Sequence, residues 1–288
     1  MATVAVPGEV RAGVWARLGR PSPLVIVAIV VAAFVAVLVL AGSWLAPHDP
    51  GKQNLLASGA PPGDGHLFGT DSLGRDVLSQ VMAGAGTAVA GPAIIALGTV
   101  IIGAMLGILA GYRGGAVDAV ISRFADLMYA LPGLVVIIVL VGVVGGGYWF
   151  AAIVLTVLMV PGEIRLCRSA TLVQARLPYV EAARTLGLSG SRIMFRHIVL
   201  NIMPTIIATL LLDFVSALIA LSGLSYLGLG VPPGTPDWGA LLQDGQSLLA
   251  VNPWLSLAPA IMIILTATSV TIIGDWMYDR FTERSEQR

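Results

Sequence analysis

Charge is scarce in this sequence of 288 residues, in which acidic and basic residues together make up only 11%. A typical soluble domain carries about 25% charged residues. Apolar residues make up 57% of the chain. This composition excludes an ordinary soluble domain and predicts a membrane protein. Because several membrane spans would use most of the length, we expect no large soluble domain.

Cysteine is almost absent as well. Cys167 is the only one, which excludes a disulfide within the chain and most metal sites built from cysteines. We expect it to be a small buried residue rather than a reactive thiol.

The sequence also lacks the motifs of several enzyme classes. The only lysine, Lys52, follows Gly51 but precedes Gln53, so the chain has no phosphate-binding loop of the form G-x-x-x-x-G-K-[ST] and cannot itself hydrolyse ATP. No H-E-x-x-H motif occurs, and no Ser/His pair lies within a span. The three histidines are scattered along the sequence, at His48, His66 and His197. We therefore predict no catalytic residue and no metal site.

Long uncharged runs are present instead, and a membrane span needs about 20 such residues. The first run, 24–46, is longer than the 7–15 residues of a signal-peptide core, so we expect an uncleaved span. The next run, from Val77 to Tyr112, is too long for one span, and we expect a short surface helix over 77–86 before the second span. The six expected spans cover 24–46, 87–111, 120–144, 148–170, 198–222 and 254–275. The predicted fold is an all-α membrane protein.

Small residues and prolines mark where these spans pack and bend. Gly103 and Gly107 form a small-xxx-small pair, which predicts close packing of the second span against another helix. Pro132 predicts a kink in the third span, and the glycines at 145–147 predict the turn that follows it.

Basic residues orient the chain. Fourteen of the sixteen lie in segments that share one side of the membrane, and only Lys52 and Arg75 lie on the other. The positive-inside rule places the first set, with both termini, in the cytoplasm. The predicted layout is a cytoplasmic segment (1–23), the first span (24–46), an extracytoplasmic loop with a short helix (47–86), a core of five spans (87–275) containing a cytoplasmic loop (171–197) and an extracytoplasmic loop (223–253), and a cytoplasmic tail (276–288).

The cytoplasmic loop contains a predicted helix of about nine residues. Pro178 suits its first turn, Glu181 suits the positive end of its dipole, and Gly187 suits its end. Its apolar positions follow a helical spacing, at Tyr179, Ala182, Ala183 and Leu186. Such a helix could lie on lipid headgroups or dock another protein. The small residues, with no Trp or Phe, favour a protein partner.

Asp213 is the only acidic residue well inside a predicted span. A charge there costs roughly 2.5–3.5 kcal/mol on insertion scales, so it is a candidate functional residue. It could line a translocation path and meet an amino group, or bond a neighbouring helix or a partner subunit. Arg123 and Asp126, one turn apart, are expected to form a local ion pair.

The extracytoplasmic loops hold two further patterns. The D-x-x-G-x-D frame at Asp71, Arg75 and Asp76 has too few oxygen ligands for a calcium loop, and we favour a turn that caps the following helix. The segment 224–239 is rich in Gly and Pro and carries Asp237 and Trp238; it predicts a rigid loop that folds back toward the bilayer.

Several of these segments resemble one family. EAA at 181–183 followed by Gly187 resembles the cytoplasmic EAA loop of ABC-importer permeases, whose helix docks on an ATPase subunit. The strings GTDSLGRDV (69–77), RFADLMYALPGL (123–134) and the segment 224–239 resemble signatures of the C-type permeases of dipeptide, oligopeptide and nickel importers. The chain is thus identified as similar to a permease subunit with the type I ABC importer fold.

The resemblance implies a location in the bacterial cytoplasmic membrane and a set of partners. These are a B-type permease in a heterodimer, two ABC ATPases and an extracytoplasmic substrate-binding protein. ATP and magnesium would bind to the ATPases, so no cofactor is expected in this chain, and no nucleic acid. The cargo would be di- or oligopeptides, with nickel chelates and glutathione-like peptides as alternatives. The ATPase-coupling residues would be Tyr179, Glu181, Ala182, Ala183, Arg184, Leu186 and Gly187. Asp71, Arg75, Asp76, Asp237 and Trp238 would face the binding protein.

Two other classes compete with this interpretation. An ion-coupled carrier would need a relay of ionisable groups within the membrane, and the sequence offers only Asp213. A membrane-embedded hydrolase would need a catalytic pair, which the sequence does not contain.

Overall fold

The computed structural model describes residues 22–63 and 65–286, with side chains through residue 280. The regular secondary structure of this part is helical, and the only β features in it are isolated bridges. The α-helices are α1 (Pro23–Leu45), α2 (Val77–Arg113), α3 (Gly115–Tyr129), α4 (Gly133–Val144), α5 (Gly147–Gln174), α6 (Pro178–Thr185), α7 (Gly190–Ile193), α8 (Val199–Tyr226), α9 (Trp238–Gly245) and α10 (Trp254–Glu286). Three short turns complete the set: η1 (Leu55–Ala57), the π-helical η2 (Met194–Ile198) and η3 (Gln246–Leu248).

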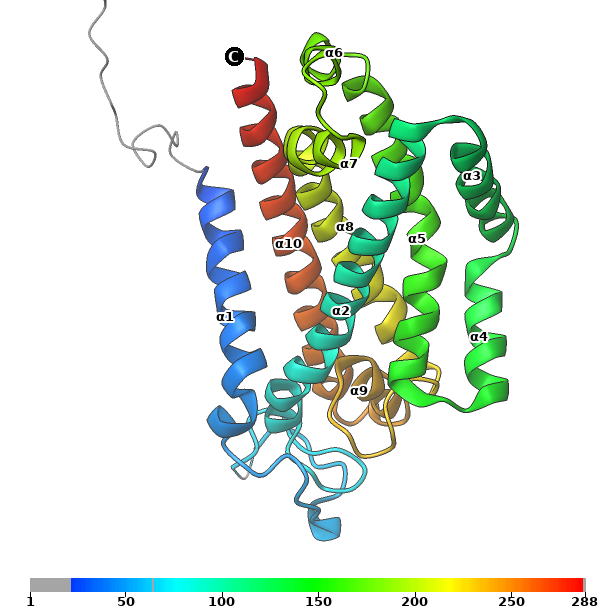
Figure 1. The fold of residues 1–288 in the computed structure, drawn as a ribbon. Coiled ribbons are helices and arrows are strands. Elements are labelled where there is room, and N and C mark those ends of the chain that lie inside the picture. Colours follow the sequence, from blue (N-terminus) through cyan, green and yellow to red (C-terminus); the bar gives the residue numbers. More distant parts are fainter. Residues whose placement is uncertain (1–21, 64, 287–288) are drawn as a thin grey trace, which may run out of the picture.

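Five helical segments in the described residues are long and apolar enough to cross a membrane, and the bent pair α3–α4 makes a sixth if it counts as one span. The all-helical membrane fold is therefore confirmed, with five or six candidate spans in the described residues where six were expected. α6, α7, the α2–α3 turn and the C-terminal end of α10 lie at one end of the molecule (Figure 1). The loop before α2, the α4–α5 turn and α9 lie at the other end. This alternation agrees with the sides predicted from the basic residues.

α2 differs from the prediction of a surface helix followed by a separate span. It is one continuous helix of 37 residues, about 55 Å long. Pro92 lies inside this helix and does not interrupt it. A hydrocarbon core of about 30 Å leaves several turns outside the membrane. Residues 77–86 are thus the first part of a long helix rather than an element of their own.

The glycines of α2 allow α5 to approach closely, as predicted. A Cβ at Gly103 would lie 2.5 Å from the Cβ of Glu163, and one at Gly107 would lie 2.6 Å from the carbonyl oxygen of Ile164. Only glycine fits at such distances, and α2 packs most extensively on α5. Close backbone contact therefore fixes the centre of the bundle.

The third predicted span is broken at the proline. α3 and α4 meet at an angle of 76°, and Pro132 is the residue that precedes α4. Gly145 and Gly147 have positive φ angles of 67° and 66°, which allows the sharp turn into α5.

The predicted layout included a separate segment at each end of the chain. The predicted N-terminal segment 1–23 lies outside the described residues except for Ser22 and Pro23. The tail predicted as a separate segment, 276–288, instead continues α10 as far as Glu286. Five arginine side chains counted for orientation lie outside the described part: Arg11, Arg17, Arg20, Arg284 and Arg288.

Candidate functional site

α6 is the helix predicted in the cytoplasmic loop, and the structure confirms where it begins and ends. Pro178 is its first residue and Glu181 lies in its first turn. Gly187 has a φ of +75°, a conformation that glycine adopts without penalty. Its N–H donates to the carbonyl of Arg184 at 2.9 Å, and the N–H of Leu188 donates to that of Ala183 at 3.2 Å. This pair of bonds is a Schellman motif.

The inner face of α6 packs on the chain itself. Val180 and Ala183 are buried, and they belong to a core cluster that includes Ile108 of α2, Ile193 of α7 and Ile202 of α8. The Tyr179 hydroxyl donates to Gln174 Oε1 at 2.9 Å, and burial raises the pKa of this phenol. α6 is therefore attached firmly to the spans beneath it.

Arg184 adds a contact on the side of α6. Its guanidinium lies 5.1 Å from the ring centroid of Tyr112, at the end of α2.

The outer face of α6 is uncovered. Glu181, Ala182 and Thr185 are exposed, and Leu186, which is 79% exposed, follows directly after the helix. The predicted single apolar face was wrong in one respect, because Ala183 turns inward with Val180 while Ala182 and Leu186 point outward. The outer surface combines small residues, one large apolar side chain and charge. α6 itself lies at one end of the bundle (Figure 1).

α6 is linked to the spans through a continuous helical segment. α7, η2 and α8 follow one another without a break, so that 190–226 forms one helical segment. Because α6 contacts α7 and η2 through its buried face, a displacement of α6 would act directly on α8.

Among the residues that the structure describes, two acidic side chains lie within the bundle, where one was expected. Asp213 lies on α8, and its Oδ2 is buried without a hydrogen-bond partner among the described residues. Glu163 on α5 is 4% exposed and accepts bonds from Thr209 Oγ1 at 3.2 Å and Cys167 Sγ at 3.0 Å. Thr209 precedes Asp213 by one helical turn, so both acids border the same stretch of α8.

Glu163 was not among the residues expected at a functional site. The sequence signal that could have identified Glu163 is its position four residues before Cys167. This spacing puts the two side chains on one face of a helix. Cys167 is buried, as expected.

Asp126 pairs with a different arginine from the one expected. Its carboxylate lies 2.6 Å from Nη2 of Arg165 on α5, rather than pairing with Arg123 of its own helix. The Arg165 guanidinium also lies 4.2 Å from the ring centroid of Tyr129. The packing of α3 against α5 brings these groups together, and sequence spacing could not reveal it.

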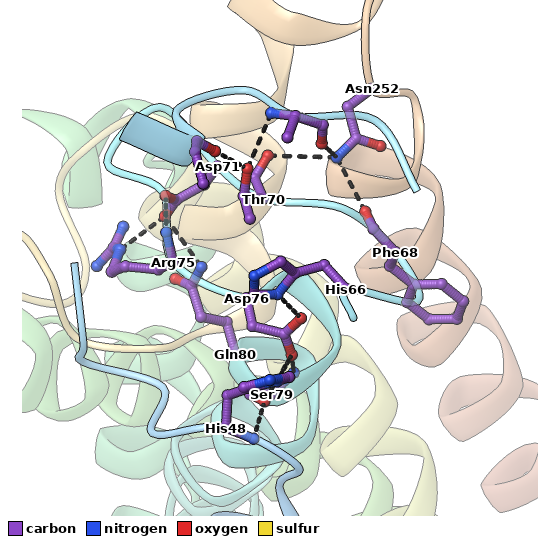
Figure 2. Close-up of polar contacts among 12 residues, drawn as sticks. His48, His66, Phe68, Thr70, Asp71, Arg75, Asp76, Ser79, Gln80 and Asn252 are labelled. Atoms are coloured by element: carbon purple, nitrogen blue, oxygen red, sulfur yellow. Dashed lines mark hydrogen bonds and ion pairs between the residues drawn. The ribbon is translucent and has the colours of Figure 1, made fainter. Parts of the chain in front are cut away.

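The five residues expected to face a binding protein are buried in the chain instead: Asp71, Arg75, Asp76, Asp237 and Trp238. Asp71 Oδ2 accepts from Arg75 Nε at 2.6 Å and from Gln80 Nε2 at 2.9 Å (Figure 2). The indole N–H of Trp238 donates to the carbonyl of Val81 at 2.9 Å. These side chains hold the loops on α2 and offer no contact surface, so that prediction was wrong.

The two remaining aspartates of this group are helix caps. Asp76 accepts from the N–H of Ser79 at 2.8 Å at the start of α2, and Asp237 accepts from the N–H of Gly239 at 3.0 Å at the start of α9. Burial raises the pKa of Asp237, although hydrogen bonds from backbone N–H groups oppose the rise. The predicted helix-capping turn at the start of α2 is confirmed.

An apolar cavity of about 600 Å³ lies between α4, α5 and α8. It is lined by Ile137, Leu155 and Leu224 among others, and it borders a strip of exposed apolar side chains on α4. This face of the bundle is open in the single chain.

Comparison with known proteins agrees with this architecture. Residues 103–287 match the family described as binding-protein-dependent transport system inner membrane component. The chain is 34% identical over 267 residues to the probable D,D-dipeptide transport system permease protein DdpC of Escherichia coli, covering 92% of this chain and 89% of that protein. It is 33% identical over 260 residues to the oligopeptide transport system permease protein OppC of Bacillus subtilis, covering 90% of this chain and 85% of that protein.

A further relative is the glutathione transport system permease protein GsiD of Pectobacterium atrosepticum. The two are 33% identical over 259 residues, which cover 88% of this chain and 85% of that protein. Among solved structures, the inward-facing MetNI methionine ABC transporter matches with a TM-score of 0.58 at 15% identity, covering 70% of this chain and 96% of that one. At this identity the match shows the fold, which is that of a type I ABC importer permease.

Proposed function

The chain belongs to the family of binding-protein-dependent transport system inner membrane components, and we propose that it forms half of the translocation pathway of a peptide importer. It is a multi-pass membrane permease rather than an enzyme, so it works with ATPase subunits and a substrate-binding protein. Di- and oligopeptides are the proposed cargo, because the similar permeases carry those names. Nickel chelates and glutathione-like peptides are the alternatives. The proposed location is the bacterial cytoplasmic membrane.

The observation that carries the proposal is the position of α6. Its inner face is packed on the spans, while Glu181, Ala182 and Leu186 stay uncovered at the end predicted to be cytoplasmic. A lipid-bound helix would bury large apolar residues in the bilayer. This small-residue surface suits a groove on an ATPase, which supports the role of residues 179–187 in coupling.

The proposed mechanism uses the attachment of α6 to two spans. Closure of the ATPases on ATP would displace α6, and the contacts of Val180 and Ala183 would transmit the movement to α2 and, through η2, to α8. The spans would then alternate between inward-open and outward-open states. The two states must differ in their contacts with the ATPases, because only a differential interaction can shift such an equilibrium.

Asp213 is the proposed residue of the pathway. Its Oδ2 has no partner among the described residues, and an unpaired carboxylate within a membrane needs one. The amino group of a peptide could supply it during transport. The alternative is a donor from a partner subunit. If a peptide supplies the donor, replacing Asp213 should change uptake. If a partner subunit supplies it, the replacement should change only assembly.

A B-type permease is the proposed second half of the pathway. The uncovered apolar side chains of α4, such as Leu134 and Val143, and the cavity beside them would be covered in such a heterodimer. Two ATPase subunits would then contact the two permeases, one on each coupling helix.

The first test is purification of the tagged chain from its native membrane in a mild detergent, followed by mass spectrometry. We expect a second permease and ATPases with phosphate-binding loops. A chain that comes out alone or only with itself would refute the importer proposal and favour an ion-driven carrier that uses Asp213 and Glu163. Complete loss of uptake on removing the proton gradient, with ATP held constant, would support that carrier.

The second test concerns α6 itself. Glu181→Lys should leave the assembly intact but separate ATP hydrolysis from peptide uptake in proteoliposomes, because it reverses the charge on the docking surface. Asp279→Lys is the matched control, since it makes the same charge change at an exposed position on α10. Normal uptake by Glu181→Lys, or equal loss in both variants, would contradict the assignment of α6.

A further inference from the structure

Two of the three histidines, scattered in the sequence, lie side by side in the structure (Figure 2). His48 follows α1, His66 lies in the loop that leads to α2, and Asp76 is the N-cap of α2. His66 Nδ1 lies 2.8 Å from Asp76 Oδ1, and His48 Nδ1 lies 3.7 Å from Asp76 Oδ2. One donor atom from each of the three residues lies within 4.8 Å of the others.

We propose that His48, His66 and Asp76 bind a divalent transition-metal ion, with Zn²⁺ as the best fit. Two imidazoles and one carboxylate form a ligand set that zinc accepts, with water at the fourth position. Donor atoms about 2.1 Å from a tetrahedral zinc ion lie about 3.4 Å apart. One donor atom from each residue lies within 4.8 Å of the others, so small movements of the side chains would bring the three donors to that spacing. A metal ion would take the place of the hydrogen bond between His66 and Asp76.

Ser79 supports two of the three ligands at once. Its hydroxyl donates to Asp76 Oδ2 at 2.6 Å and accepts from the backbone N–H of His48 at 3.0 Å. His66 is held separately, because its own N–H donates to the carbonyl of Gly63 at 2.7 Å. Outer partners that orient the ligands are typical of built metal sites, and their loss weakens binding by about 10–100-fold.

The exposure of the ligands leaves a path for the ion. The side chain of Asp76 is 2% exposed, that of His66 21% and that of His48 44%. The site is thus anchored on a buried carboxylate and opens toward solvent on the side of His48. It would connect the segment after α1, the loop and the start of α2, at the end of the molecule opposite α6.

A metal-free alternative is a hydrogen bond from His66 to Asp76 that only fixes the loop. That bond needs one imidazole, whereas the second imidazole, with its ring centroid 4.8 Å from the first, completes a three-donor set. The two accounts predict different behaviour toward added zinc.

The test measures Zn²⁺ binding to the full-length chain in lipid nanodiscs, with a purification tag that contains no histidine. A fluorescent zinc chelator serves as the competitor. We expect one zinc per chain in the wild type, at least a tenfold loss of affinity in His48→Ala and in His66→Ala, and about a 10–100-fold loss in Ser79→Ala. His197→Ala is the matched control, because it removes a histidine outside the cluster and should bind zinc as the wild type does.

X-ray absorption of the zinc-loaded wild type keeps the test independent of how the variants fold. We expect nitrogen or oxygen neighbours at about 2.0–2.1 Å with the scattering pattern of two imidazoles. Absence of saturable binding, unchanged affinity in His48→Ala, or a spectrum without imidazole scattering would overturn the proposal. None of these outcomes bears on peptide import, which the co-purification and uptake assays decide.

Discussion

Gly187 offers a sharp test of how α6 is held in place. Its φ of +75° is unfavourable for any residue with a Cβ, and no heavy atom lies within 4 Å of the position that a Cβ would take. The cost of Gly187→Ala therefore comes from backbone conformation alone. For an L-residue in the left-handed region this cost is about 1–2 kcal/mol.

Hydrogen exchange can measure this cost directly. The Schellman bonds, made by the N–H groups of Gly187 and Leu188, open when the end of α6 frays. A cost of about 1–2 kcal/mol raises the open population by roughly 5–30-fold. Amides in a peptide spanning 178–188 should therefore exchange about 5–30 times faster in Gly187→Ala, and uptake per ATP hydrolysed should fall.

Two further variants control the experiment. Gly187→Asn should exchange more slowly than Gly187→Ala, because asparagine adopts the left-handed conformation more readily. Gly142→Ala, at an open helical position in α4, should leave exchange at 178–188 unchanged. Exchange in Gly187→Ala equal to that of the wild type, or no difference between Ala and Asn, would refute the argument that the φ of Gly187 terminates α6.

Three other predictions follow from contacts in the structure. Gly107→Ala should destabilise the protein by about 1–3 kcal/mol, because the new methyl would meet the backbone of α5 at 2.6 Å, and thermal unfolding in detergent should show the loss. A double-mutant cycle between Asp126 and Arg165, both about half exposed, should give a coupling of about 0.2–1 kcal/mol, whereas the pair Arg123 and Asp126 should give none. Burial raises the pKa of Asp237 in the folded state, so the folded protein binds this proton more tightly than the unfolded chain and loses stability as pH rises from about 4 through the raised pKa. Asp237→Asn should flatten that fall in melting temperature, and an unchanged pH profile would contradict it.

Much of the candidate site could be predicted because it depends on neighbours in the sequence. Pro178, Glu181 and Gly187 act within their own helix, so the bounds of α6 follow from local chemistry. The pattern could not say which face would turn inward. That choice is made by Ile108, Ile193 and Ile202, which come from three different segments and surround Val180 and Ala183.

The same distinction applies to the loops at the other end. Sequence alone identified Asp71, Arg75 and Trp238 as notable, yet placed them on a contact surface. The structure buries them, because the loop before α2 and the segment 223–253 fold over the first turns of the same helix. Contacts across more than 150 residues, such as Trp238 with Val81, leave no trace in local spacing.

The sequence by itself determined the class of protein, most of the apolar helices and the bounds of α6, since hydrophobic length, basic-residue bias and capping residues act over a few turns of chain. Only the tertiary structure decided which charged groups meet. It paired Asp126 with Arg165, placed Glu163 beside Thr209, and brought His48 and His66 to one carboxylate. Such pairs depend on where separate helices begin and cross, and that is set by the packing of the whole bundle.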